Sequence, residues 1–506
     1  MVTGITHDSR QVRSGDLYAA LPGALTHGAR FGAAAAEAGA AAVLTDHAGV
    51  DHLHAAGVRL PTLVVTAPRV HLGTVAAMIY GHPARDLLML GITGTNGKTT
   101  TAYLLDAGLR AAGESVGLIG TVETRVGDEV VASVRTTPEA TDVHALLAVM
   151  RERGVTACAM EVSSHALVYG RVDGIVFDVV GFTNLSQDHL DFHADLDDYF
   201  AAKASLFTPH RARRAVICVD DEYGRRLADL AGIPAHTVAT LPAPVDHGRM
   251  QVETPVDHAN AHDQRGTVGA TGATGATRAT RATGATGATR TGAGTVVGAT
   301  GATWTVIGGG NRRRLRHVDG AEVGLPVPLP GQFNVANAAL AVAMLIDAGI
   351  DSGVAATGVG SCAGVPGRMQ QVSVTDSSAP LALVDYAHTP DAVANVLAAL
   401  HPAGRLIVVV GAGGDRDPHK RPLMGAAAAR GADVVIVTDD NPRSEDPAAI
   451  RAAVVAGATS VPEGERAELI EVADRRAAIR AALESADGPA DTVVVLGKGH
   501  EQGQEI

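Results

Sequence analysis

Short apolar runs of strand length recur along the chain and alternate with amphipathic or Ala-rich stretches. The runs lie at 16–21, 41–46, 61–66, 87–93, 157–163, 176–184, 214–220, 381–387, 405–414, 433–441 and 491–499. Most of them lead into a turn and then a helical pattern. This βα alternation predicts an α/β fold with mainly parallel sheets and ligand sites at the C-terminal ends of the strands.

The runs form three series, which predict three domains with bounds 1–85, 86–365 and 366–506. Between the second and third series, residues 269–294 repeat Gly-Ala-Thr and related triplets. The tract lacks proline, so a collagen helix is not expected, and it offers little apolar surface to bury. We expect a disordered surface insertion at about 260–303 with no catalytic role.

One predicted helical face contains a lysine. Leu196, Tyr199, Phe200, Lys203 and Phe207 follow the spacing of an apolar stripe, so Lys203 is predicted to be buried. An unpaired ammonium group is costly there. The chain otherwise avoids lysine, since only four of its 41 basic residues are lysine and the rest are arginine. Position 203 therefore needs a property that arginine lacks.

Composition narrows the classes of function. The net charge of −13 and an aromatic content of 3% argue against a general nucleic-acid or anionic-membrane binder. Cys158, Cys218 and Cys362 are far apart and are expected to be buried, reduced thiols. The N-terminus has no apolar signal segment, and no apolar run is long enough to span a membrane. We expect a soluble, cytoplasmic protein.

The strongest motif is GTNGKTT, residues 94–100, between an apolar strand and a helix. Backbone N–H groups of such a loop bind phosphate oxygens, helped by the helix N-terminus. Lys98 can reach the outer phosphates, and the Thr99 hydroxyl can bind Mg²⁺. The spacing differs from the plain Walker A motif by one residue, because the glycine is at 91 and position 92 is Ile.

Two later strand ends carry polar side chains. Glu161 ends an apolar strand and is a candidate Mg²⁺ ligand. FTNLSQDHLDFH, residues 182–193, ends the next strand and is predicted to form a polar wall of the site. His189 in this stretch is not assigned from the residues alone, because Mg²⁺ prefers oxygen ligands.

Three strand ends in the third series carry both charge signs. The polar residues there are Arg416, Lys420, Arg421, Asp440, Asn441, Arg443, Lys498, His500 and Glu501, with Gly497 among them. Guanidinium groups can hold a carboxylate while carboxylates hold an ammonium group, so this crevice suits a zwitterion.

Together these motifs resemble the Mur ligases, the ATP-dependent amino-acid ligases of peptidoglycan synthesis. The ordered matches cover nearly the whole chain: HDSR, GDLYAALPG, TGTNGKTTT, TTPEAT, MEVSSHAL, FTNLSQDHLDFH, AAKASLF, LPGQFNVANA, VPGRMQ, DYAHTPD, GGDRDPHKRPLMG, DDNPR and GKGHE. DDNPR is the signature of the members that add meso-diaminopimelate.

The resemblance implies an N-terminal UDP-sugar domain, a central ATP-binding domain and a C-terminal Rossmann-like domain for the amino acid. It implies that ATP phosphorylates the D-glutamate side-chain carboxylate of UDP-MurNAc-L-Ala-D-Glu, and that an amine of meso-diaminopimelate attacks the acyl phosphate. Mg²⁺ would be the cofactor. The partners would be small-molecule substrates, with no nucleic acid and no membrane insertion, and the chain is expected to be a monomer.

In the family the lysine matching Lys203 is carbamylated by CO₂ and becomes an anion that supports a second Mg²⁺. Arginine cannot replace it, because a carbamate needs a nucleophilic amine that can lose its proton. The resemblance thus supplies a reason for lysine at position 203.

The resemblance also assigns roles to individual residues. The catalytic residues are Lys98, Glu161, His189 and Lys203, and the metal ligands are Thr99, Glu161, His189 and Lys203. The ATP-binding residues are Gly94, Thr95, Asn96, Gly97, Lys98, Thr99, Thr100, Asn334 and Asn337. The UDP-sugar and its dipeptide are assigned to Ser9, Thr136, Thr137, Ser163 and Arg171. Diaminopimelate is assigned to Arg416, Asp440, Asn441, Pro442, Arg443, Gly497 and Glu501.

The chain departs from the family in three ways. Tyr169 stands where relatives often carry Gln beside the substrate, and the Gly-Ala-Thr tract is not a family feature. Both ends look shorter than usual, from which we expect reduced stability or activity.

Three kinds of alternative remain open. They are a sibling ligase adding L-lysine or D-alanyl-D-alanine, a folylpolyglutamate synthetase, and a nucleotide-binding homologue that no longer ligates. DDNPR argues against the first two, and the intact Lys98, Glu161, His189 and Lys203 argue against the last.

Overall fold

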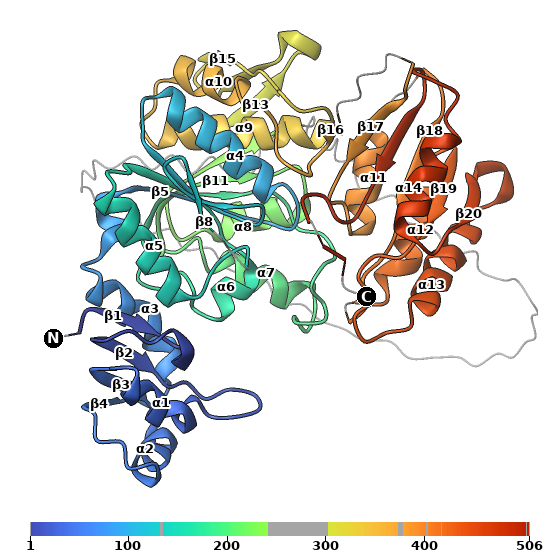
Figure 1. Ribbon diagram of the computed structural model, residues 1–506. Helices are drawn as coiled ribbons and strands as arrows, with labels where there is room; N and C mark the ends of the chain where they lie inside the picture. The colour runs from blue at the N-terminus through green and yellow to red at the C-terminus, as the bar shows by residue number, and fades with distance from the viewer. Residues whose placement is uncertain are drawn as a thin grey trace, which may run out of the picture. The chain divides into compact units, whose positions relative to one another are not determined.

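Three separate sheets organise the computed structural model, which describes residues 2–131, 135–240, 302–372, 378–400, 403–415, 417–501 and 503–504 (Figure 1). These residues belong to one compact unit. The predicted α/β fold with mainly parallel sheets is confirmed. The domain bounds stay a prediction. Arg416 and nearly all of the expected insertion at 260–303 lie outside the described residues.

The first sheet has four parallel strands in the order β1-β2-β3-β4. They are β1 (Gly4–Thr6), β2 (Asp16–Ala19), β3 (Ala42–Thr45) and β4 (Thr62–Val64), with helices α1 (Gly32–Glu37), α2 (His47–Ala55) and α3 (Pro68–Ile79). A Cβ at Gly73 of α3 would lie 2.3 Å from the carbonyl oxygen of Asp173. Glycine therefore lets α3 pack directly against backbone that belongs to the central part of the chain.

The central sheet has eleven strands among the described residues, in the order β15-β14-β13-β12-β11-β10-β5-β9-β6-β7-β8. The strands are β5 (Leu88–Thr93), β6 (Val116–Ile119), β7 (Thr124–Val126), β8 (Glu129–Val131), β9 (Ala157–Glu161), β10 (Phe177–Phe182), β11 (Ala212–Cys218), β12 (Ala235–Ala239), β13 (Trp304–Ile307), β14 (Arg314–His317) and β15 (Glu322–Gly324). Its middle is parallel, and antiparallel strands extend it at both edges.

Helices cover both faces of this sheet (Figure 1). The helices are α4 (Lys98–Ala111), α5 (Ala140–Glu152), α6 (Ser164–Val168), α7 (Leu196–Ala204), α8 (Glu222–Leu230), α9 (Gln332–Asp347) and α10 (Ser352–Gly360). One apolar core joins the sheet to α4, α9 and α10, and a second joins the opposite face to α5 and α7. Burial on both faces explains why these strands read as continuous apolar runs.

The third sheet has the order β16-β17-β21-β18-β19-β20, with only β16 antiparallel. Its strands are β16 (Gln370–Val372), β17 (Leu381–Val384), β18 (Leu406–Val410), β19 (Val434–Val437), β20 (Glu468–Glu471) and β21 (Thr492–Val495). Its helices are α11 (Pro390–Ala398), α12 (Lys420–Gly431), α13 (Pro447–Thr459) and α14 (Arg475–Glu484). The strands β21, β18 and β19 are neighbours, so their C-terminal ends meet at one edge.

Strands β12 and β13 are parallel neighbours although more than sixty positions separate them in the sequence. Val238 pairs with Trp304, and the residues before them exchange two hydrogen bonds. Thr303 N donates to Thr237 Oγ1 at 2.9 Å, and Thr237 N donates to Thr303 Oγ1 at 3.2 Å. The end of one strand and the beginning of the next are therefore fixed side by side.

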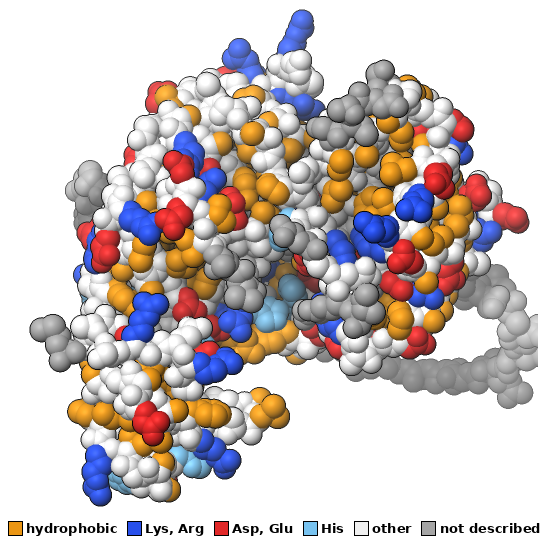
Figure 2. Space-filling model, in the orientation of Figure 1, with side chains coloured by type: hydrophobic (Ala, Val, Ile, Leu, Met, Phe, Trp, Pro, Cys, Tyr) orange, Lys and Arg blue, Asp and Glu red, His pale blue; other side chains and the backbone are white. Residues whose placement is uncertain are grey.

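The cysteines are reduced, and charged side chains of both signs lie on one face of the molecule (Figure 2). All three cysteines are described and free; Cys158 and Cys218 are buried as predicted, whereas Cys362 is only half-buried. Burial raises the pKa of the Cys158 thiol to about 12. Within the described ranges, no helix has the length and apolarity that crossing a bilayer requires. Basic and acidic side chains are interspersed on the face shown in Figure 2.

Candidate active site

The loop of residues 94–97 joins β5 to α4 and has a backbone that only glycine adopts easily at two points. Gly97 caps α4 with a φ of 88°, and a Cβ there would lie 2.3 Å from Asn337 Oδ1. A Cβ at Gly94 would lie 1.9 Å from Thr183 Oγ1. The glycines thus let the loop close tightly over the helix N-terminus, the geometry of a phosphate site.

Two lysines contact this loop. Lys98 Nζ donates to the carbonyl oxygens of Gly94 and Thr95 at 3.0 and 2.9 Å. Lys203 Nζ donates to the Gly94 carbonyl at 2.7 Å and lies 4.4 Å from the centroid of the Tyr199 ring. The predicted burial of Lys203 is confirmed, since only 1% of the residue is exposed.

The predicted helical face is also present, with one difference. Tyr199, Phe200 and Lys203 are buried on α7, but the helix ends at Ala204, so Phe207 packs into the core from beyond it. Burial, together with the charge of Lys98, holds the pKa of Lys203 well below its usual range. A neutral amine at this position is a possible nucleophile.

Glu161 is the centre of a hydrogen-bond network at the end of β9. Its carboxylate accepts from Thr99 Oγ1 at 3.0 Å and from the Thr121 N–H and hydroxyl at 2.8 and 3.1 Å. The Thr121 hydroxyl also lies 3.0 Å from Thr136 Oγ1, from which it can accept a hydrogen bond. Two oxygen donors, from Thr99 and Glu161, thus stand beside the phosphate loop, which fits Mg²⁺.

His189 lines one cavity together with Thr99 and Glu161, and its backbone is strained, at a φ of 55°. Burial lowers the pKa of its imidazole well below the usual value, against the opposing charge of Asp188. The neutral ring keeps a nitrogen lone pair, so it can act as a metal ligand. No three His, Cys, Asp or Glu side chains among the described residues are grouped as a complete metal site. A metal ion would therefore need hydroxyl, phosphate or water ligands as well.

The residues assigned to the muramoyl dipeptide continue this network. Thr137 Oγ1 donates to the Glu161 carbonyl at 2.8 Å and accepts from the Ser163 N–H at 3.2 Å. Arg171 Nη1 donates to the Thr137 carbonyl at 3.2 Å. Ser9 is not among the residues lining these cavities; it begins a short 3₁₀ helix next to the first sheet.

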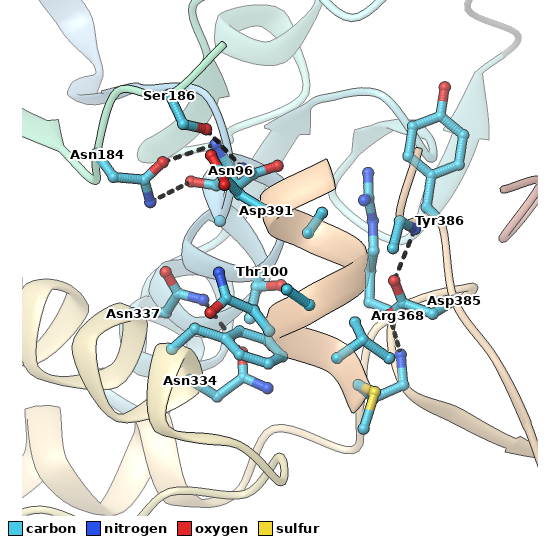
Figure 3. A pocket seen from close by; sticks show the side chains of 18 of the residues that line it. Asn96, Thr100, Asn184, Ser186, Asn334, Asn337, Arg368, Asp385, Tyr386 and Asp391 are labelled. Carbon is cyan, nitrogen blue, oxygen red and sulfur yellow. Dashed lines mark hydrogen bonds between the residues drawn. The ribbon is translucent and has the colours of Figure 1, made fainter. Parts of the chain in front are cut away.

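A cavity of about 450 Å³ lies next to the loop and is bordered by Asn334 and Asn337 of α9. Asn337 Nδ2 donates to Asn334 Oδ1 at 3.1 Å, and Asn334 Nδ2 donates to the Pro330 carbonyl. Figure 3 shows these amides on one side of the helix that carries Asp391, with Arg368 and Tyr386 on the other. The cavity therefore combines polar groups from α9 with groups from the third sheet.

The sequence reasoning gave no role to several residues of this cavity. Arg368 Nη2 donates to Thr99 Oγ1 at 3.3 Å, and its guanidinium carbon lies 4.3 Å from the centroid of the Tyr386 ring. His388 is close to Asp188, with 3.9 Å between Nε2 and Oδ2. These residues lie in the motifs VPGRMQ and DYAHTPD, whose sequences alone do not indicate a chemical role.

The residues predicted to bind the amino acid lie at the shared edge of β18, β19 and β21. Lys498 Nζ donates to Asn441 Oδ1 at 2.7 Å and lies 3.8 Å from Asp440. Asn441 Nδ2 donates to Glu501, and Arg443 Nη1 donates to the Gly414 carbonyl at 2.6 Å. The structure thus brings Asp440, Asn441, Lys498 and Glu501 together, while Arg443 contacts the neighbouring Gly414.

Other predicted residues of the crevice have different surroundings. Gly497 has a φ of 105°, and a Cβ there would lie 2.7 Å from Asp440 Oδ2. Arg421 pairs with Glu445 through two hydrogen bonds, so its guanidinium stabilises the loop itself. Pro442 follows Asn441 in the same loop, and its carbonyl oxygen would lie 1.9 Å from a Cβ at Gly414.

Comparison with known families covers most of the chain. The Mur ligase family catalytic domain matches residues 1–80, the Mur ligase middle domain matches 92–253, and the Mur ligase glutamate ligase domain matches 367–499. A protein of Streptomyces coelicolor is 52% identical over 508 residues, which are 100% of this chain and 89% of that protein. This chain belongs to the Mur ligase family.

Relatives and solved structures agree with this assignment. The S. coelicolor protein is named UDP-N-acetylmuramoyl-L-alanyl-D-glutamate--2,6-diaminopimelate ligase, as is a relative from Corynebacterium glutamicum that is 44% identical over 100% of this chain and 88% of its own. A solved structure with the same name has 28% identity and a TM-score of 0.60, covering 100% of this chain and 91% of that one. MurF of Acinetobacter baumannii, at 17% identity and a TM-score of 0.62 over 98% and 90% of the two chains, shares the fold.

Proposed function

We propose that this Mur ligase joins meso-diaminopimelate to the side-chain carboxylate of D-glutamate in UDP-MurNAc-L-Ala-D-Glu, using ATP. The observation that carries this choice is the loop of residues 440–443. It places the carboxylate of Asp440 beside Gly497 and the amide of Asn441 beside Glu501, and its Arg443 donates to the Gly414 carbonyl. The names of the S. coelicolor and C. glutamicum relatives support the same substrates.

The charge pattern of this loop favours binding of diaminopimelate over L-lysine. Diaminopimelate carries an ammonium group and a carboxylate at each end, whereas L-lysine lacks the second carboxylate. Arg443 would bind that carboxylate, while Asp440 and Glu501 would bind an ammonium group. With L-lysine in the crevice, the guanidinium of Arg443 would have no carboxylate from the substrate, which would disfavour binding.

The first step would be phosphoryl transfer at the loop of residues 94–97. The D-glutamate carboxylate attacks the γ-phosphorus of ATP, the bond to the β-phosphate oxygen breaks, and ADP leaves. Lys98 and Arg368 would offset the negative charge that spreads over the phosphoryl oxygens. Mg²⁺, held by Thr99, Glu161 and His189, would neutralise phosphate charge and orient the oxygens.

The second step would be attack on the acyl phosphate. A neutral amine of diaminopimelate, held by the loop of residues 440–443, adds to the acyl carbon. The tetrahedral intermediate then loses a proton from its nitrogen and expels phosphate, which leaves the amide. The role of the crevice is to hold this amine in line with the acyl carbon, which raises its effective concentration.

Lys203 would act as a carbamate rather than as an ammonium group. Its buried amine has a strongly lowered pKa, so it can lose a proton and add to CO₂. The anion formed would lie next to Lys98 and would support a second Mg²⁺.

We further propose that the protein is a monomer and acts in the cytoplasm, where its nucleotide-linked substrates are made.

ADP release tests the proposed function. The purified chain is supplied with ATP, Mg²⁺, bicarbonate and UDP-MurNAc-L-Ala-D-Glu, and with meso-diaminopimelate, L-lysine or no amino acid. Release that requires diaminopimelate is the expected result. Release with L-lysine instead would move the chain to the sibling activity, and ATP binding without release in any of the three conditions would favour a non-catalytic homologue.

A further inference from the structure

Two guanidinium groups lie over the ring of Tyr169. The Cζ atoms of Arg69 and Arg171 are 5.7 and 5.6 Å from the ring centroid, and Phe192 packs against the same ring at 5.4 Å between centroids. Arg69 is in the first turn of α3, whereas Arg171 follows α6. The tyrosine therefore joins two arginines that are far apart in the sequence.

The same two arginines share one carboxylate. Glu139 Oε1 lies 2.8 Å from Arg171 Nη2, and Glu139 Oε2 lies 3.4 Å from Arg69 Nη1. Arg135 is a third cation at 3.8 Å from Glu139, and Asp142 is the second acid in electrostatic range of Arg135. Among the described residues, Glu139 and Asp142 thus face Arg69, Arg135 and Arg171, which leaves one positive charge to be balanced.

Arg69 and Arg171 keep one unused donor and partial access to solvent. Arg171 Nε is buried and has no hydrogen-bond partner among the described residues. The Arg69 side chain is 39% exposed, so it remains accessible from solvent. A partly buried cation with an unused donor is stabilised when an anion completes its hydrogen bonds.

The position of the pair indicates which anion would fit. Arg171 donates to the Thr137 carbonyl, and the Thr137 hydroxyl donates to the Glu161 carbonyl, so the pair is two hydrogen bonds away from the end of β9. Arg69 cannot move far, because α3 packs at Gly73 directly on the backbone of Asp173. An anion of the substrate that lies close to its reacting carboxylate would be within reach of this pair.

We propose that Arg69 is a substrate-binding residue that, together with Arg171, clamps the α-carboxylate of the D-glutamate, with Tyr169 as the surface that holds both guanidinium groups. The inference rests on the proposed function, in which the side-chain carboxylate of the same D-glutamate reacts. That residue has only one other carboxylate, and the Cα, Cβ and Cγ atoms separate it from the reacting one. A helix of the first sheet would then recognise the peptide part of the substrate.

The test compares two ligands that differ only at this carboxylate. UDP-MurNAc-L-Ala-D-Glu and its α-carboxamide counterpart, UDP-MurNAc-L-Ala-D-isoglutamine, are titrated by calorimetry into the full chain without ATP or diaminopimelate. Arg69→Gln should weaken binding of the first ligand roughly tenfold, the loss expected for one charge-assisted hydrogen bond. It should leave binding of the carboxamide unchanged.

Control variants separate a binding role from a structural one. Arg153→Gln removes another exposed arginine that pairs with a single carboxylate, that of Glu129, and should change neither affinity. Arg69→Lys keeps the charge and serves if Arg69→Gln does not fold; it should weaken only the carboxylate ligand. Equal weakening of both ligands, or no weakening, would overturn the inference. A wild-type chain that binds neither ligand would instead overturn the proposed function, and the inference with it.

Discussion

Lys98 and Lys203 donate hydrogen bonds to the same carbonyl oxygen, that of Gly94, at 3.0 and 2.7 Å. Two ammonium groups that share one acceptor in a buried site repel each other, which contributes to the lowered pKa of Lys203. The repulsion between the two lysines becomes weaker when an anion binds next to either of them or forms on one of them. ATP would supply it for Lys98, and carbamylation would supply it for Lys203.

Lys203→Arg should abolish most of the activity, because arginine cannot form the carbamate and keeps its positive charge next to Lys98. We expect the rate of ADP release to fall by roughly 100-fold or more, the scale seen when a group that stabilises charge in an active site is removed. Wild-type protein in ¹³C-bicarbonate should show a carbamate carbon signal by NMR, and the variant should lack it. An active variant would exclude the carbamate.

Arg368→Lys should slow phosphoryl transfer more than it weakens substrate binding. Lysine keeps the charge but loses the planar group that reaches Thr99 and covers Tyr386. We expect kcat to fall by about 10- to 100-fold, with little change in KM for the UDP substrate. Tyr386→Phe, which removes only a hydroxyl that bonds to Glu501, should have a much smaller effect on kcat.

Arg443→Ala should act on the amino acid alone. Loss of a guanidinium–carboxylate contact should raise KM for diaminopimelate by roughly 10- to 100-fold and leave KM for ATP unchanged. Steady-state ADP release with one substrate varied at a time measures both constants. A parallel rise in KM for ATP would show that the loop of residues 440–443 also affects the ATP-binding site.

His236 should make stability depend on pH. Its Nδ1 lies 2.8 and 3.0 Å from the two carboxylate oxygens of Asp347, and this pair raises the pKa of the imidazole above its usual value, against partial burial and the charge of Arg214. The stabilisation is therefore fully present below the unfolded pKa, roughly 6.5, and is lost as pH rises through the folded pKa. The gap in melting temperature between wild type and His236→Gln should be larger at about pH 5.5 than at about pH 8.5. An equal difference in melting temperature at both pH values would contradict a pH-dependent contribution of His236.

Gly73→Ala should destabilise the fold. The new methyl group would meet the backbone of Asp173 at 2.3 Å, and backbone cannot move aside cheaply. We expect a loss of about 1–3 kcal/mol in the free energy of unfolding, the cost of overpacking. Gly324→Ala is the matched control, because a Cβ there has no neighbour within 4 Å. Denaturant unfolding of both variants gives the comparison.

Local pattern was enough to predict some of these features and not others. The burial of Lys203 and the parallel strands follow from periodicity and apolar runs, which are properties of neighbouring residues. The three-residue strands β7, β8 and β15 are too short to produce a period. Two other contacts join residues from different elements: Arg368 with Thr99, and Arg69 with Tyr169. Only the folded chain brings these residues together.

Val238, near the end of β12, pairs with Trp304, the first residue of β13. Because those two points are neighbours, closing the sheet requires only that a connector bridge a short gap, whatever its length. Loop closure costs grow slowly, by about 0.6 kcal/mol for each doubling of the connector. This junction can therefore accept or lose long stretches of sequence while the catalytic residues stay in place. It is a natural point for inserting a foreign domain or a reporter into the enzyme.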